Sequence, residues 1–525
     1  METVTGNTLK SGVDIEGTRS KGYFRNLDGN LGKASISGGS SLLVSEVGCN
    51  IFRLLGIVIL ARLLMPEHFG LVGMVMAITA AAELFKDIGL ATVTVKEKDI
   101  THDQISTLFW INVGVGMALL LLLAGAAPAI SWFYGDSRLL WVAGAVSSTF
   151  LFGGLTVQHQ ALLRRNMKFT QLAAIQLIST GLSVLVSIVL AWKGFGYWAL
   201  VWREIVRSVA SAVGVWLLCR WLPSVPRFGA DVGKLFRSGS HVSGFNVLVF
   251  GSRSLDQILL GKFWGPESVG LYKQAGTVLQ LQYSLITFPI TYVMTPALSA
   301  LQSEPEKYCK YYKQALALLA FCHMPTIAYF VVFSDSIITV VLGQKWIQTA
   351  PILQILAIGS LFEAVVSTTG IIMVTSHKTH EYLLLGAINA VLLIAAFAIG
   401  VTWGAIGVAG AIMAFSFVSL PLVVWFSLRG TPILASQFYE AISLPLLATV
   451  IMSGCLFAIQ FLLGVEHGFS EIAYSLVLAP LIYCGVWLLF PGGKQKLLGY
   501  LLHLRGAMGG LIARADSPSS ATTPK

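Results

Sequence analysis

The chain has 525 residues, of which 55% are hydrophobic and only 11% are Asp, Glu, Lys or Arg. A soluble globular protein carries roughly 25% of these charged residues, so this chain has too few to cover its surface against water. The mean hydropathy of +0.75 excludes a cytosolic enzyme, a nucleic-acid binder and a disordered scaffold as descriptions of the whole chain. We therefore predict an all-α integral membrane protein.

Neither the net charge nor the cysteines indicate a soluble partner. The formal charge of +10 comes without a cluster of Lys and Arg interleaved with aromatic residues, so we expect no nucleic-acid partner. The six cysteines form no Cys-x-x-Cys or Cys/His spacing, which argues against a metal site. We expect no cofactor.

Apolar segments separated by short polar breaks lie between two predicted cytoplasmic tails, a disordered one at 1–40 and a second at 492–525. A membrane-spanning helix needs roughly 20 residues of low charge. This template predicts about fourteen spanning helices, at 41–64, 69–93, 106–133, 138–162, 171–192, 196–219, 237–262, 269–299, 314–342, 347–374, 382–402, 404–427, 440–463 and 469–490. The amphipathic segment 269–299 and the closely spaced pair at 382–427 match the template least well.

Basic residues support an orientation with both termini in the cytoplasm. With the N-terminus inside, the predicted cytoplasmic segments hold 24 of the 35 Lys and Arg residues, the outside segments hold six, and five lie within spans. Cytoplasmic loops of membrane proteins carry an excess of Lys and Arg. The distribution therefore favours an even number of helices and explains the basic charge by topology.

An internal repeat relates the two halves of the chain. When 53–71 is aligned with 253–271 without gaps, seven of 19 positions are identical, including Arg53 with Arg253. Only about one or two identities are expected by chance. Both segments run from a helix into the motif Pro-Glu-x-x-Gly-Leu.

Six predicted helices separate the starts of the two repeated segments, so both segments enter the membrane in the same direction, as in the parallel repeats of some secondary transporters. We predict a six-helix N-lobe at 41–220, a cytoplasmic connector at 221–234, a six-helix C-lobe at 235–428 and two further helices at 429–491. Two pseudo-symmetric lobes that face each other enclose a central cavity, which a transporter requires.

Several short motifs, in this order along the chain, resemble those of a known family. They are Ala61-Arg62-Leu63-Leu64-Met65-Pro66-Glu67-His68-Phe69-Gly70-Leu71 with Asp87-Ile88-Gly89-Leu90, Ala161-Leu162-Leu163-Arg164-Arg165, Gly196-Tyr197-Trp198-Ala199-Leu200, Ser252-Arg253-Ser254-Leu255-Asp256, and Phe288-Pro289 to Pro296-Ala297-Leu298. Together they resemble the lipid-linked oligosaccharide flippases of the MOP (multidrug/oligosaccharidyl-lipid/polysaccharide) superfamily, in particular its exopolysaccharide branch. The resemblance covers about residues 41–430.

The resemblance implies that the protein moves oligosaccharide repeat units linked to undecaprenyl pyrophosphate from the inner to the outer leaflet of the bacterial inner membrane. The protein would move these units by alternating access of the two lobes, and the units would serve the synthesis of exopolysaccharide, capsule or O-antigen. The resemblance implies a transporter without enzymatic activity. The resemblance also implies partners: the lipid-linked oligosaccharide, membrane lipids, and the polysaccharide polymerase and glycosyltransferases of the same synthesis.

Charged residues inside the predicted spans are the candidate substrate contacts, because each costs at least ~2.5 kcal/mol near the middle of a membrane. Arg53 and Arg253 occupy equivalent helices, and Arg203 and Arg207 lie one turn apart on the sixth helix. A guanidinium group can bind phosphate oxygens with two parallel hydrogen bonds. We include Asp256, three residues after Arg253, in the candidate site. The alternative is that each arginine pairs with a carboxylate and only joins helices.

Acidic residues within the spans are candidate carriers of a coupling ion, H+ or Na+. Glu46 lies seven residues before Arg53 and shares its helix face, and Glu363 lies near the middle of the predicted helix 347–374. A carboxylate buried among apolar residues could carry a coupling proton, or it could be neutral or paired with an arginine. Glu204, the neighbour of Arg203, is a candidate structural partner.

Aromatic residues gather near the predicted outer helix ends. Trp and Tyr are enriched where a membrane meets water, because their rings lie at the level of the lipid headgroups. An interfacial belt therefore explains this group better than a sugar-stacking site. Its members are Trp192, Tyr197, Trp198, Trp202, Trp264 and Trp346.

Two other functions stay open alongside the flippase. An ion-coupled multidrug exporter of the same superfamily would share the lobes, but it is expected to carry fewer cavity arginines and more acids, because its usual substrates are cations. A membrane-embedded glycan polymerase or acyltransferase would need a catalytic constellation, usually in a large loop. The predicted loops hold no cluster of His, Asp, Glu and Ser, so the flippase is favoured.

Overall fold

The computed structural model describes residues 31–83, 85–86, 89–97, 100–226, 254–376, 378–463 and 468–500, and all regular secondary structure within them is helical. The helices of the first part are α2 (Leu31–Leu63), α3 (Pro66–Glu83), α4 (Leu90–Lys96), α5 (His102–Tyr134), α6 (Arg138–Arg165), α7 (Phe169–Trp192) and α8 (Trp198–Cys219). Those of the second part are α10 (Leu255–Gln282), the π-helical turn η2 (Tyr283–Thr287), α11 (Phe288–Ala300), α12 (Pro305–Val332), α13 (Ser334–Val341), η3 (Gln344–Trp346), α14 (Thr349–Ser360), α15 (Glu363–Thr375), α16 (Thr379–Gly400), η4 (Val401–Trp403) and α17 (Gly404–Leu428). Helices α18 (Ala435–Leu463) and α19 (Phe469–Leu489) follow.

Nine stretches of the described chain are long and apolar enough to cross a membrane. One of them, His380–Leu428, holds both α16 and α17, and another, Thr349–Thr375, holds both α14 and α15. The chain is therefore an all-α, multi-pass membrane protein, as predicted. The number of fourteen spans stays a prediction, since the expected helix 237–262 begins outside the described residues.

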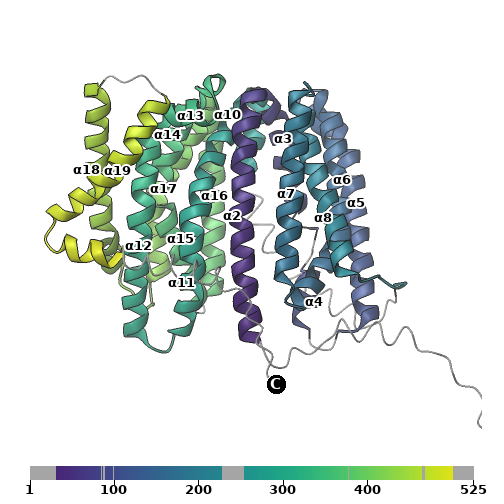
Figure 1. The fold of residues 1–525 in the computed structure, drawn as a ribbon, viewed down its shortest axis with the longest axis horizontal. Coiled ribbons are helices and arrows are strands. Elements are labelled where there is room, and N and C mark those ends of the chain that lie inside the picture. The colour runs from purple at the N-terminus through teal and green to yellow at the C-terminus, as the bar shows by residue number, and fades with distance from the viewer. Residues whose placement is uncertain are drawn as a thin grey trace, which may run out of the picture.

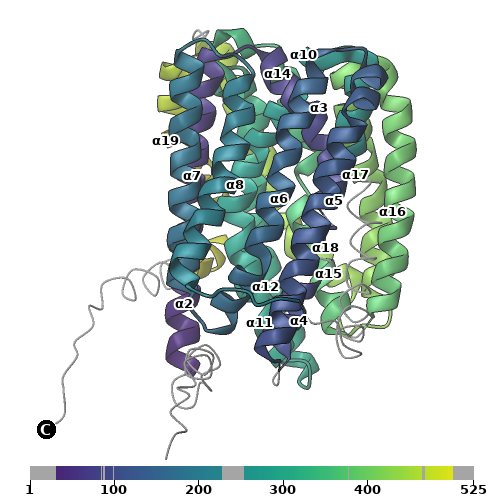
Figure 2. The ribbon, with the colours of Figure 1, turned by 90° about the vertical axis from the view of Figure 1, so that its right-hand side faces the viewer.

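The helices form two neighbouring groups. We call α2 to α8 the first half and α10 to α17 the second half; in Figure 1 most of the first half lies on the right and most of the second half on the left, α2 and α10 lie near the middle, and α18 and α19 lie at the far edge of the second half. In the first half α7 packs against α2 and α8, and in the second half α14 packs against α12 and α17. Seen from the side, the helices run roughly parallel from one end of the bundle to the other (Figure 2). The residue boundaries of the predicted lobes stay predictions.

One expected tail and three expected spans differ from the observed helices. The tail expected to be disordered up to residue 40 is helical from Leu31, where α2 begins. The helix expected at 69–93 ends at Glu83, and α4 starts after Gly89, whose φ of 73° breaks a right-handed helix. The span expected at 314–342 is wrong at both ends: α12 begins at Pro305, because proline suits a first helical position, and it ends before α13. The span expected at 347–374 is interrupted between α14 and α15.

The repeated Pro-Glu-x-x-Gly-Leu motifs meet where α3 packs against α10. A Cβ atom on Gly70 would overlap the carbonyl group of Pro266, and a Cβ atom on Gly270 would overlap the carbonyl group of Pro66. Each motif thus sets its glycine against the proline of the other, an approach that requires the missing side chain. In the second motif, Gly265 (φ 77°) kinks α10 immediately before Pro266. The sequence repeat corresponds to a reciprocal contact between the halves.

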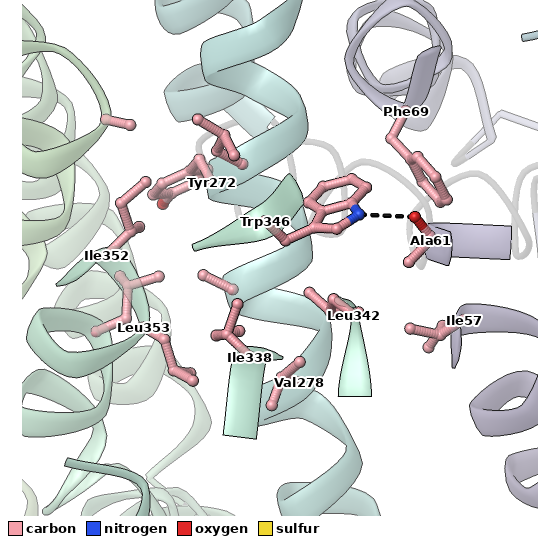
Figure 3. Packing of buried hydrophobic residues seen from close by; sticks show 14 of the residues in the cluster. Ile57, Ala61, Phe69, Tyr272, Val278, Ile338, Leu342, Trp346, Ile352 and Leu353 are labelled. Atoms are coloured by element: carbon pink, nitrogen blue, oxygen red, sulfur yellow. Dashed lines mark hydrogen bonds between the residues drawn. The ribbon is translucent and has the colours of Figure 1, made fainter. Parts of the chain in front are cut away.

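Further contacts join the halves at the same end of the bundle, which we call the closed end. Trp346 donates from Nε1 to the carbonyl oxygen of Ala61 (2.8 Å) and packs edge-on against Phe69, with ring centroids 5.2 Å apart (Figure 3). Arg62 donates from Nη2 to the carbonyl oxygen of Val340 (2.7 Å). Trp346 is fully buried, so its assignment to an interfacial belt is wrong. The carbonyls of the last helical turn lack intrahelical partners, and Ala61 supplies one to the buried indole N–H.

Candidate functional site

A cavity of about 430 Å³ lies between the two halves. Helices α2 and α7 of the first half form one wall, and the continuous leg α10–η2–α11 of the second half forms the other. The lining residues are Glu46, Asn50, Arg53, Ile57, Gln176, Thr277, Gln280, Leu281, Tyr283, Ser284, Phe288 and Tyr292. The cavity therefore brings together residues that are more than 200 positions apart in the sequence.

The first wall carries a charged cluster around Arg53. Residues three and seven positions apart share a helix face, and Arg53 Nη1 donates to Asn50 Oδ1 (2.9 Å) and to Glu46 Oε1 (3.0 Å). Gln176 of α7 donates from Nε2 to Glu46 Oε2 (2.9 Å), so both oxygens of the carboxylate are occupied. This arrangement holds Arg53 in a fixed position on the cavity wall.

Arg53 keeps part of its binding capacity for a ligand. Its side chain is 48% exposed, and both of its hydrogen bonds leave from the single nitrogen Nη1. Within the described part of the chain, Nε and Nη2 make no hydrogen bond. These two N–H groups form one edge of the guanidinium plane and match two oxygens of a phosphate group. The geometry suits the predicted role of Arg53 as a substrate contact.

The opposite wall is polar without being charged. Apart from the aliphatic Leu281, its lining residues carry hydroxyl, amide and aromatic groups, and they are Thr277, Gln280, Leu281, Tyr283, Ser284, Phe288 and Tyr292. The two walls thus differ in chemistry: ionic groups line the first and neutral hydrogen-bonding and aromatic groups line the second. An amphiphile with an anionic part and a neutral polar part fits such a cavity.

A second charged cluster lies on α8. Arg203 and Arg207 both donate to the carboxylate between them, Arg203 Nη2 to Glu204 Oε1 at 3.0 Å and Arg207 Nη2 to Glu204 Oε2 at 2.8 Å. Glu204 is buried, and electrostatic interactions link the cluster to Glu83 of α3 and Lys273 of α10. None of these residues is part of the cavity lining. The structure therefore places Arg203 and Arg207 in an ion-pair network apart from Arg53.

The other predicted site residues lie elsewhere. Asp256 is buried, and its Oδ2 accepts a hydrogen bond from the hydroxyl of Tyr272 (2.8 Å) across the kink in α10. Glu363 is exposed in the first turn of α15, so the expectation of a buried carboxylate inside a continuous helix is wrong. A glutamate at that position instead complements the positive end of the helix dipole. Arg253 lies outside the described residues.

Sequence reasoning missed most of the cavity lining, above all the neutral wall. Those residues belong to the amphipathic span expected at 269–299, one of those that match the template least well, which holds many Gln, Thr and Ser residues. These uncharged polar residues were the signal in the sequence that could have indicated a cavity wall. Uncharged polar side chains in a membrane helix are stable where they face a cavity or another polar group rather than lipid.

Known structures with this fold define the class of protein. The lipid II flippase MurJ in an inward closed conformation matches with a TM-score of 0.69 and 17% identity, over 84% of this chain and 97% of MurJ. A MATE family multidrug resistance transporter of the MOP superfamily, in an inward-facing conformation, matches with a TM-score of 0.57 and 14% identity, over 76% of this chain and 99% of the transporter. The chain shares its fold with these two membrane proteins.

Sequence relatives narrow this class. The teichuronic acid biosynthesis protein TuaB of Bacillus subtilis is 25% identical over 431 residues, which are 80% of this chain and 88% of TuaB. The lipopolysaccharide biosynthesis protein WzxC of Escherichia coli is 24% identical over 419 residues, 78% of this chain and 84% of WzxC. The family model of polysaccharide biosynthesis proteins matches residues 59–351, and the chain belongs to this family. The resemblance inferred from the sequence motifs is confirmed.

Proposed function

We propose that the protein is a flippase that moves oligosaccharide repeat units linked to undecaprenyl pyrophosphate across the bacterial inner membrane, for exopolysaccharide, capsule or O-antigen synthesis. Membership of the polysaccharide biosynthesis family and the fold shared with the flippase MurJ support this function. The relative ExoT of Rhizobium meliloti is named a succinoglycan biosynthesis transport protein. The observation that carries the proposal is the partly exposed Arg53 in a cavity between the two halves.

The chemistry of the substrate fits the cavity. The anionic pyrophosphate binds the free Nε and Nη2 edge of Arg53, because charge-assisted hydrogen bonds are strong where water is scarce. The glycan occupies the remaining volume beside the neutral wall. The undecaprenyl tail lies in the lipid that surrounds the bundle.

The closed end gives the cavity one sealed side. Arg53 precedes Ala61 by eight residues of α2, so the cavity lies about 12 Å from the contact between Ala61 and Trp346. With the predicted topology, the closed end faces the periplasm and the substrate enters from the cytoplasmic leaflet. Alternating access then requires the closed end to open while the other end closes.

Reporter fusions test this orientation independently of transport. Fusions after Gly135 and Gly265, both at the closed end, are expected to read periplasmic, and a fusion after Arg165 is expected to read cytoplasmic. The opposite pattern would reverse the direction of the proposed cycle. An odd number of spans would place the C-terminus outside and remove the predicted symmetry of the lobes.

Glu46 is the proposed carrier of a coupling proton. In the structure its Oε1 accepts a hydrogen bond from Arg53, the same side chain that we assign to the pyrophosphate. When the phosphate oxygens replace Glu46 as partner of Arg53, the carboxylate loses its neutralising cation and becomes available to a coupling ion. Glu363 is less suited, because it is exposed and lies outside the cavity lining.

Deletion of the gene tests the function. We expect the null strain to lose its surface polysaccharide and to accumulate lipid-linked oligosaccharide in the inner leaflet, protected from a membrane-impermeant oxidant added to spheroplasts. Wild-type protein should restore export and Arg53→Ala should not. Normal surface polysaccharide in the null strain would overturn the proposal, and accumulation in the outer leaflet would indicate a polymerase instead.

A further inference from the structure

The leg of the second half that lines the cavity has an unusual composition for a membrane helix. Between Lys273 and Glu304 the chain carries no charged residue, yet it holds several Gln, Thr, Ser and Tyr residues. This leg, which comprises the end of α10 with η2 and α11, is not among the nine described stretches that are both long and apolar enough to cross a membrane. A helix that only faced lipid would gain nothing from these groups, so they point to polar partners, either within the protein, as for Gln282 and Thr287, or in an uncharged polar ligand.

The polar side chains continue along one face of the leg. Ser284, Phe288 and Tyr292 line the cavity at intervals of four residues, which brings them to one side of a helix. Thr295 and Ser299 continue the same row beyond the cavity, and both are exposed. We call these five residues the neutral face. It runs from the cavity toward the end of the bundle opposite the closed end.

The π-helical turn at the start of the neutral face is held in place by a buried histidine. Gln282 directly precedes the turn and Thr287 is its last residue. Gln282 Nε2 and Thr287 Oγ1 lie 3.0 Å and 3.3 Å from His323 Nδ1, in hydrogen-bonding geometry. His323 Nε2 lies 3.0 Å from the carbonyl oxygen of Ser360, where α14 ends. An extra residue in a helical turn rotates the face that follows it, and such turns are frequent at functional sites. The direction of the neutral face is therefore fixed by packing.

Two aromatic rings form the centre of the neutral face. Phe288 and Tyr292 are 42% and 52% exposed, and their ring centroids are 5.8 Å apart with the planes inclined by 34°. The hydroxyls of Thr295 and Ser299 donate to backbone carbonyls four residues earlier in the helix, which leaves their oxygen lone pairs as acceptors. Aromatic faces next to hydroxyl acceptors suit a sugar ring, whose C–H groups pack on the rings while its hydroxyls donate.

We infer that the neutral face is the glycan-recognition wall of the cavity, where a pyranose ring near the pyrophosphate packs on Phe288 and Tyr292 while Arg53 binds the pyrophosphate. The inference rests on the proposed flippase function and adds to it a division of labour between the walls. The sugar is recognised by the second half and the anion by the first half. Movement of the halves against each other then acts on both parts of one substrate.

Binding to the purified full-length protein in lipid nanodiscs tests the inference. The probes are undecaprenyl pyrophosphate without sugar and the lipid-linked oligosaccharide extracted from the null strain. For Phe288→Leu and for Tyr292→Leu we expect about threefold to tenfold weaker binding of the glycosylated lipid and unchanged binding of the sugar-free lipid. Tyr292→Phe, which keeps the ring, should stay close to the wild type. Arg53→Ala should weaken binding of both lipids.

Phe461→Leu is the matched control, because Phe461 is 82% exposed on α18, away from the cavity lining. Equal weakening of both lipids in the Phe288 and Tyr292 variants would show a contact with the lipid tail and overturn the inference. Unchanged binding of both lipids, or a wild-type protein with no preference for the glycosylated lipid, would also overturn it and leave the flippase proposal standing. Failure of the wild-type protein to bind either lipid would contradict the proposed function itself.

Discussion

The two arginine sites of the first half have opposite surroundings. On α2, Arg53 gives one nitrogen to Glu46 and keeps a hydrogen-bonding edge inside the cavity. On α8, Arg203 and Arg207 both point their Nε and Nη2 groups at the single carboxylate of Glu204. The comparison teaches that a charge within a span does not by itself mark a substrate contact. What matters is how much of its hydrogen-bonding capacity the protein already uses.

Loss of the cavity arginine should have the largest effect on transport. Because Arg53 offers an unused edge to the substrate, we expect Arg53→Ala to reduce export at least about tenfold at unchanged membrane abundance. Arg53→Lys keeps the charge and loses the planar fork, so its export should be intermediate. The measurement is surface polysaccharide of complemented null cells, normalised to membrane protein. Full export by Arg53→Ala would remove this residue from the mechanism.

The bridged cluster should respond through stability instead. Glu204→Ala leaves two guanidinium groups without their shared carboxylate, but the side chains of Arg203 and Arg207 are 31% and 56% exposed, so water offsets part of the loss and we expect a cost of about 1–2 kcal/mol. Arg203→Ala should cost less, because Glu204 keeps its bonds to Arg207. Membrane abundance and thermal unfolding in detergent report these effects. Normal abundance with abolished export in Glu204→Ala would show that this cluster also contacts substrate.

Opening the closed end should expose the cavity that holds Arg53. In Gly270→Ala the new Cβ meets the backbone of Pro66, whereas Gly276→Ala in the same helix meets no atom within 4 Å. We expect only the first change to make an introduced Ile57→Cys, on the cavity wall, reactive to an impermeant maleimide added from the periplasmic side. The native cysteines are replaced for this measurement. Equal reactivity in both variants would argue against the seal.

Removal of the charge on Glu46 tests whether the cavity pair does more than position an arginine. Glu46→Gln keeps an oxygen that can accept from Arg53 but cannot take up a proton at physiological pH. We expect slower export that no longer responds to a protonophore, measured as flipping in membrane vesicles. Unchanged sensitivity to the protonophore would assign the coupling proton to another residue, or the coupling to another ion.

Among the arginines compared, one at the surface should have the smallest effect on export and abundance. Arg138 at the closed end donates from Nη2 to Asp136 and to Glu67, at 2.7 Å each. Exposed ion pairs contribute about 0–1 kcal/mol, so Arg138→Ala should leave export and abundance nearly unchanged. A marked loss of either would show that the charge serves the closure of the halves.

The ion pair between Arg138 and Asp136 makes a small contribution to the stability of the fold that depends on pH. Hydrogen bonds from Arg138 hold the pKa of Asp136, in the turn before α6, below its ordinary value. The carboxylate therefore stabilises the fold above the pKa of the unfolded chain, about 3.9, and this contribution is lost as the pH falls through the lowered pKa. Thermal unfolding between pH 6 and pH 3 should show a shallower decline in Asp136→Asn than in the wild type. Identical slopes would contradict this assignment.

Composition was sufficient to predict the class of fold, because low charge and long apolar runs leave few alternatives in a membrane. The sequence also located Arg53 and Glu46 on one helix face, since seven residues make two turns. It could not show that Arg203 and Arg207 share Glu204, because rotamers decide which neighbour a guanidinium meets. Trp346 illustrates the same limit: an aromatic residue near a helix end can face lipid or fill the contact between two halves.

The neutral wall escaped prediction for a different reason. Thr, Ser and Gln at helical spacing have no charge to mark them, and their orientation depends on the π-helical turn, which shifts the register by a residue. The prediction for Glu363 was wrong for another reason. The helix is interrupted at Leu361 and Phe362, so the residue expected in the middle of a helix lies at the start of one.

The paired glycines and prolines at the closed end have the pattern of an isologous interface, the kind that joins two identical subunits around a two-fold axis. Residue 66 meets residue 270 and residue 266 meets residue 70, so a single surface patch is used twice within one chain. A bulky substitution in either copy damages a contact to which both copies contribute. The effects of Gly70→Ala and Gly270→Ala should therefore not add.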